Sequence, residues 1–120
     1  MKIRKKTNPV LTDLIDKLIL KSREEGVQIW RDVAKRLNRP TRQRVAVNIS
    51  KLNRYVRENE LAIVPGKVLG SGTIEHPITV SSFGFSELAY DKITKAKGRC
   101  LTIEEFMGEN PKGSGVKIIQ

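Results

Sequence analysis

The chain has 120 residues, of which 38% are hydrophobic and 30% are charged, with 23 Lys and Arg against 13 Asp and Glu and a formal net charge of +10. This size suits one domain with a modest core, and the composition argues against a disordered basic tail. The single cysteine, Cys100, excludes an internal disulfide, and no apolar run approaches the ~20 residues needed to cross a bilayer. We therefore expect one soluble domain, 1–120, in a reducing intracellular compartment.

The positive charge is confined to the N-terminal half. Residues 1–57 hold 16 Lys and Arg against 5 Asp and Glu, a net of +11, whereas residues 58–120 have a net of −1. Between residues 33 and 57, eight basic residues occur without one acidic residue. Ordinary surfaces mix both signs, so this segment indicates a polyanionic partner.

Two helices are predicted after a basic arm. Residues 1–7 are basic and lack apolar periodicity, so we expect an extended arm. Asn8 and Pro9 predict the start of a helix that Gly26 ends, with apolar residues at helical spacing between them. A second amphipathic helix is expected over residues 29–38.

A basic loop, a short strand and a third helix are predicted next. Residues 39–44 carry three arginines around a proline, which is typical of a loop, and residues 45–49 alternate as a strand does. Ser50 is the expected N-cap of a helix in which Leu52 and Val56 form the apolar side. The basic residues of this helix would lie on the opposite side.

The second half is predicted to interleave short strands with short helices. Strands are expected at residues 61–64, 67–69, 78–81 and 116–119. The first two would be separated by a turn at Pro65 and Gly66. Helices are expected at residues 87–97 and 103–107, capped by Ser86 and Thr102, and Gly98 would stop the first. The element order indicates an α/β fold.

Lysine and arginine side chains are the candidate binding residues, because they neutralise phosphates and release condensed counterions. The residues predicted to bind nucleic acid are Lys2, Arg4, Lys5, Lys6, Arg31, Lys35, Arg36, Arg39, Arg42, Arg44, Lys51, Arg54, Arg57 and Lys67. RNA is favoured over DNA, since no helix-turn-helix, zinc-finger or zipper pattern is present. Tyr55, beside Arg54, either stacks on a splayed base or packs half-buried at a helix border.

No motif supports catalysis. The segment Gly66–Gly72 lacks the spacing of a phosphate-binding loop and reads as tight turns around a short strand. One histidine, His76, and one cysteine do not make a metal cluster, and Glu104 and Glu105 suit a helix N-terminus. We expect no enzyme activity, no cofactor and no metal.

Two other function classes stay open on the residues alone. An RNA-processing enzyme, or its RNA-binding accessory subunit, would need carboxylates near the basic face, where Glu58 and Glu60 are the only ones. A peripheral binder of anionic membranes would carry a similar basic patch.

Several blocks of sequence occur in the order seen in one known family. They are Lys6-Thr7-Asn8-Pro9, residues 29–34, residues 47–52, residues 64–72, Asn110-Pro111 and Gly113-Ser114. Through these blocks the chain resembles the archaeal and eukaryotic large-subunit ribosomal protein eighteen-e family, a relative of the universal large-subunit protein fifteen.

The resemblance implies a fold and a function. The fold would be N-terminal helices followed by an irregular β-β-α superhelical core of short strands and helices. The protein would be a structural constituent of the cytoplasmic large ribosomal subunit that binds large-subunit rRNA beside neighbouring ribosomal proteins, with no membrane and no small-molecule substrate. The short length resembles archaeal members. Thr41 stands where the family usually has a basic residue, and the charge follows at Arg42.

Overall fold

The computed structural model describes residues 9–39 and 45–120, so the predicted arm and residues 40–44 of the predicted loop lie outside it. The elements are α1 (Pro9–Glu25), α2 (Ile29–Leu37), β1 (Val45–Asn48), α3 (Ile49–Tyr55), β2 (Leu61–Leu69), β3 (Thr79–Phe85), α4 (Glu87–Lys95), β4 (Arg99–Thr102), α5 (Ile103–Glu109) and β5 (Val116–Ile118). Gly26 ends α1 with a φ of 66°, as its position predicts.

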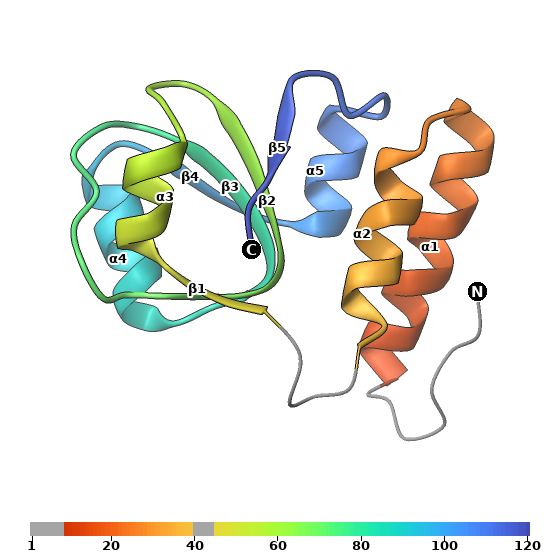
Figure 1. The fold of residues 1–120 in the computed structure, drawn as a ribbon, viewed down its shortest axis with the longest axis horizontal. Coiled ribbons are helices and arrows are strands. Elements are labelled where there is room, and N and C mark those ends of the chain that lie inside the picture. Colours follow the sequence, from red (N-terminus) through yellow and green to blue (C-terminus); the bar gives the residue numbers. More distant parts are fainter. Residues whose placement is uncertain (1–8, 40–44) are drawn as a thin grey trace.

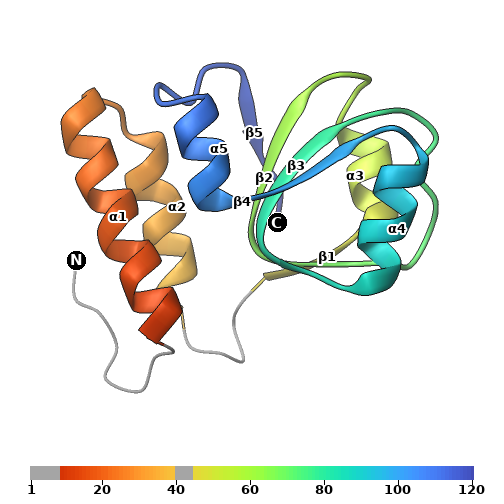
Figure 2. The same ribbon diagram turned by 180° about the vertical axis from the view of Figure 1, so that it is seen from behind.

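The strands form one five-stranded sheet in the order β1-β2-β3-β4, with β5 also pairing β2. All pairs are parallel. Helices α1, α2 and α5 lie on one side of the sheet and α3 and α4 on the other (Figure 1), an arrangement that is equally clear from behind (Figure 2). Parallel sheets bury both faces in this way. The predicted α/β class is confirmed.

Strand β2 divides its side chains between two cores. Ile63 packs with buried residues of α1, α2 and α5, whereas Ala62 and Val64 pack with those of α3 and α4. This alternation follows from the two-residue period of a strand. Each helix layer is therefore fixed to the sheet through its own apolar cluster.

The predicted turn at Pro65 and Gly66 is wrong, because both residues lie inside the continuous strand β2. Proline lacks an N–H and is normally excluded from central strands. Here the neighbouring strand changes at this point: β5 pairs with Leu61 to Ile63 and β1 pairs from Gly66 onward. The register with β3 also shifts between Val64 and Lys67. The backbone N–H that Pro65 lacks would therefore fall where the hydrogen bonding between strands is interrupted.

The N-cap of helix α3 lies two residues earlier than predicted. The cap is Asn48, not Ser50, and the Asn48 side-chain oxygen accepts a hydrogen bond from the Ser71 backbone N–H at 3.3 Å instead of capping the helix. The helix ends at Tyr55, and Val56 has an extended backbone. Arg57 consequently lies beyond the helix.

The C-terminal elements were predicted with mixed success. The Ser86 and Thr102 caps are confirmed, and Thr102 forms a complete capping box with Glu105. Strand β3 extends to Phe85, and strand β4 was missed. Helix α4 stops at Lys95, and its left-handed residue is Lys97 rather than Gly98.

No helix within residues 9–39 and 45–120 is long and apolar enough to cross a bilayer.

Candidate nucleic-acid interface

Helix α2 carries exposed cations on the side away from its core. Trp30, Val33, Ala34 and Leu37 are fully buried, and they place the intervening positions on the outer side. Arg31, Lys35, Arg36 and Arg39 occupy that outer side or the residues just after the helix; Arg31 and Lys35 are exposed and the other two half-buried. The apolar spacing of α2 thus orients its basic residues toward solvent.

Helix α3 adds a second group of cations. Arg54 is exposed, and its guanidinium carbon lies 5.8 Å from the ring centroid of Tyr55, a cation–π geometry. Lys51 is half-buried, and its Nζ donates a hydrogen bond to the backbone oxygen of Gln120. Arg57 is exposed after the helix. The sequence predicted that Lys51 points outward. In the structure it turns toward the C-terminal segment instead.

Lys67 stands on strand β2 between two small residues. Its partners across the sheet are Ala46 on β1 and Gly84 on β3. Val68, its neighbour in the chain, packs with the α3 and α4 cluster, so Lys67 points to the opposite face, the one that α1 and α2 cover. It is exposed there. Small neighbours leave its ammonium group accessible to an anion.

Most of these cations have no carboxylate partner. Within the described residues, Arg36 pairs with Asp32 at 3.0 Å, but no ion pair involves Arg31, Lys35, Arg39, Arg54, Arg57 or Lys67. Cations elsewhere, such as Lys17 and Arg99, are paired with Glu104 and Glu109. Among residues 9–39 and 45–120, Arg23, Lys95 and Lys97 outside the predicted interface also form no ion pair. The predicted interface therefore presents charge that its own surface does not neutralise.

A groove of about 600 Å³ brings parts of α2, α3 and β5 together. Its lining residues are Arg36, Lys51, Tyr55, Lys117, Ile118, Ile119 and Gln120. Lys117 was not among the residues predicted to bind nucleic acid. The alternation in β5 marks Lys117 as outward-facing, but only the pairing of β5 with β2 shows that it lies beside α3. We call this the β5 groove.

Glu60 holds Lys117 at one end of the β5 groove. Its Oε1 accepts hydrogen bonds from the Arg57 backbone N–H at 2.7 Å and from Lys117 Nζ at 3.0 Å. The Arg57 N–H, followed by Lys117, lowers the pKa of the Glu60 carboxyl from its ordinary value. Lys117 Nζ also donates to the Tyr55 carbonyl oxygen at 3.2 Å. Glu60 is thus committed to a structural role.

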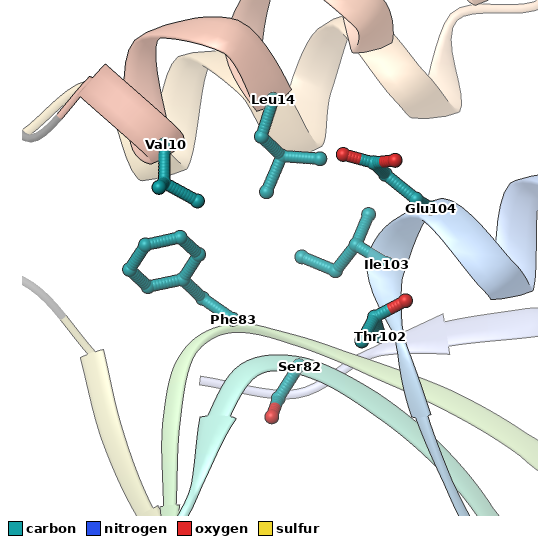
Figure 3. Close-up of a pocket in the computed structure, with 7 residues that line it drawn as sticks. All are labelled: Val10, Leu14, Ser82, Phe83, Thr102, Ile103 and Glu104. Carbon is teal, nitrogen blue, oxygen red and sulfur yellow. The ribbon is translucent and has the colours of Figure 1, made fainter.

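A second, apolar cavity of about 270 Å³ lies between the start of α1, the middle of β3 and the junction of β4 with α5 (Figure 3). Its polar groups are already engaged. The Ser82 hydroxyl donates to the Gly84 carbonyl at 2.8 Å, Thr102 caps α5, and Glu104 pairs with Lys17 at 3.3 Å. Figure 3 shows Val10, Leu14, Phe83 and Ile103 around the remaining space. The cavity offers no free acid–base pair for the enzyme alternative.

Six predicted site residues lie outside the described part of the chain. They are Lys2, Arg4, Lys5, Lys6, Arg42 and Arg44. The eight described ones lie on or just after α2, on or just after α3, and on β2. The structure brings Arg36 and Lys51 into one groove. Their contacts with nucleic acid stay a prediction.

Comparison with known proteins identifies related sequences over nearly the whole chain. The family model described as "Ribosomal protein 60S L18 and 50S L18e" matches residues 1–120. The "Large ribosomal subunit protein eL18" of Methanothermobacter thermautotrophicus is 54% identical over 115 residues, which cover 96% of this chain and 95% of that protein. Its namesakes in Methanoregula boonei and Archaeoglobus fulgidus are 51% and 48% identical, again over 96% of this chain and over 95% and 98% of their own lengths.

Proposed function

Since the chain belongs to the family of ribosomal proteins 60S L18 and 50S L18e, we infer that it is a structural constituent of the large ribosomal subunit and not an enzyme. The relatives named above are archaeal, in line with the expectation from chain length. Its place of action would be the cytoplasmic ribosome. A relation to the universal protein fifteen stays a prediction.

The function within the subunit is to bind large-subunit rRNA through the cations of α2, α3 and β2. The observation that carries this proposal is the absence, within the described residues, of carboxylate partners for Arg31, Lys35, Arg54, Arg57 and Lys67. Surface charges of one sign repel each other unless a polyanion neutralises them. Phosphates of folded RNA would supply that neutralisation and release counterions.

The salt dependence of binding tests this proposal. If about five phosphates are neutralised, log K for the full chain and large-subunit rRNA falls with log salt at a slope of roughly −3.5 to −4.5. Affinity that is indifferent to salt would contradict it. Filter binding at stepped potassium chloride concentrations gives the slope directly.

A pair of double variants tests the location of the surface. Arg31→Gln with Lys35→Gln removes two exposed cations from α2, and Lys95→Gln with Lys97→Gln removes two from the end of α4, which lies across the sheet from α2 (Figure 1). We expect the α2 pair to reduce the magnitude of the slope by about 1.4–1.8 and the α4 pair to change it little. Equal effects of the two pairs would show that net charge, and not this surface, determines binding.

A further inference from the structure

We propose that the β5 groove receives one unpaired nucleotide of the RNA, with the base against the ring of Tyr55 and the phosphate among Arg36, Lys51 and Lys117. This inference rests on the proposed function and specifies what kind of RNA element one part of the surface recognises. The groove has the chemistry of such a site, because it brings an exposed aromatic ring and three cations together on one open surface. The groove is shallow, so it suits one nucleotide lying on the surface and not an enclosed small molecule.

Tyr55 provides the stacking surface. Its side chain is 51% exposed, although an aromatic ring gains by leaving water. The Arg54 guanidinium lies 5.8 Å from the ring centroid, so a base on the other face would complete a sandwich of cation, ring and base. Tyr55 is held through its backbone, whose carbonyl accepts the hydrogen bond from Lys117. The ring can therefore contact a base without losing this hydrogen bond.

The cations around the ring are positioned but weakly engaged. Arg36 pairs with Asp32 at 3.0 Å, and Lys117 pairs with Glu60 at 3.0 Å. Ion pairs at a protein surface contribute little to stability and are screened by salt. A phosphate can join these ion pairs as an additional acceptor. The existing hydrogen bonds limit the freedom of the long side chains before RNA binds, which reduces the entropy lost on binding.

An unpaired nucleotide fits the β5 groove better than a regular duplex does. The outer edge of an A-form duplex offers phosphates and 2′-hydroxyls, while its bases stay stacked on one another. Such an edge would leave the exposed Tyr55 ring without a stacking partner. A splayed base supplies that partner, and stacking on an aromatic ring tolerates any base.

Two RNA hairpins that differ by one bulged nucleotide test the inference. Both are labelled with fluorescein, and the affinity of the full chain for each is measured by fluorescence anisotropy. Stacking of one base contributes about 1–3 kcal/mol, so we expect about tenfold tighter binding of the bulged hairpin. In a second measurement, 2-aminopurine at the bulge should lose fluorescence when it stacks on the ring.

Substitutions of the two tyrosines assign the preference to the groove. Tyr90 on α4 is a matched control, because it is 50% exposed and Tyr55 is 51% exposed. We expect Tyr55→Leu to abolish the tenfold preference, and a circular dichroism spectrum like that of the wild type shows that the variant is folded. Tyr55→Phe and Tyr90→Leu should keep the preference.

The possible outcomes separate this inference from the proposed function. Salt-dependent binding of both hairpins with equal affinity would overturn the nucleotide site and leave the rRNA-binding proposal standing. Equal losses in Tyr55→Leu and Tyr90→Leu would do the same. If the wild-type chain bound neither hairpin nor large-subunit rRNA at low salt, both proposals would fall.

Discussion

The indole Nε1 of Trp30 donates a hydrogen bond of 2.7 Å to the carbonyl oxygen of Pro111, which lies 81 residues later in the chain. The Trp30 ring is fully buried and meets Phe106 of α5 edge to face, with centroids 6.2 Å apart. These contacts attach α2, with its basic side, to the C-terminal half of the protein. The position of the candidate interface therefore depends on a residue that touches no RNA in our proposal.

Trp30→Ala should lower the free energy of unfolding by about 3–5 kcal/mol, because it leaves a cavity between α2 and α5. Trp30→Phe should cost less, about 1–3 kcal/mol, from the lost hydrogen bond and the smaller ring. Urea denaturation followed by circular dichroism measures both changes. If Trp30→Phe were as stable as the wild type, the Pro111 hydrogen bond would have no net effect on stability.

Gly66→Ala should destabilise the sheet. A Cβ atom at Gly66 would lie 2.0 Å from the Val45 carbonyl oxygen, so strand β1 would have to move away from β2. We expect a loss of about 1–3 kcal/mol or more in the free energy of unfolding. Gly84 on the neighbouring strand β3 is the control, because a Cβ there meets nothing within 4 Å. Equal stabilities of the two variants in thermal melts would contradict the close approach.

Local sequence patterns predicted which elements form, because caps and apolar spacing act over a few residues. Ser86 and Thr102 each accept the backbone N–H three residues later, as their positions predict. The failures came from contacts between distant parts of the chain. Pro65 and Gly66 have the local pattern of a turn, yet the exchange of β5 for β1 along β2 accommodates them in a strand.

In the candidate site, too, local features were predicted and contacts between distant segments were not. The sequence identified the cations of α2 and α3 from charge and helical spacing, and the structure confirms that Arg31, Lys35 and Arg54 are exposed. Lys117 could not be predicted, because its closeness to Tyr55 depends on the pairing of the last strand with the second. No local signal reports that pairing.

Glu105 should make stability sensitive to acid. Hydrogen bonds from the Thr102 backbone N–H, at 2.9 Å, and then from the Thr102 side chain lower the pKa of its carboxyl below the ordinary 4.5. A carboxyl whose pKa is lowered by folding stabilises the fold at pH values above its pKa in the unfolded chain. This stabilisation is lost as the pH falls through its pKa in the folded protein. The melting temperature of the wild type should therefore exceed that of Glu105→Gln at pH 7, and the gap should close below about pH 4.5. A gap as large at pH 3 as at pH 7 would contradict an ionic contribution.

Cys100 should react slowly with alkylating reagents. Burial raises the pKa of its thiol to about 11 from an ordinary 9.0, so the thiolate fraction at pH 8 falls about a hundredfold. The rate with iodoacetamide at pH 8 should be about a hundredfold below that of the same protein in denaturant, and it should rise with pH. Equal rates in the folded and denatured protein would show that the thiol is exposed.

Lys67 allows one phosphate contact to be removed without changing the lysine itself. Ala46 pairs with Lys67 in the register of β1 with β2 and is exposed, so a carboxylate at this position would lie beside the Nζ atom. In Ala46→Glu, we expect this carboxylate to neutralise Lys67 and weaken RNA binding, with a salt slope smaller in magnitude by about 0.7–0.9. Ala46→Gln has the same shape without the charge and should bind like the wild type. If the two variants bound RNA equally, Lys67 would lie outside the interface, and the basic surface would be limited to the helices.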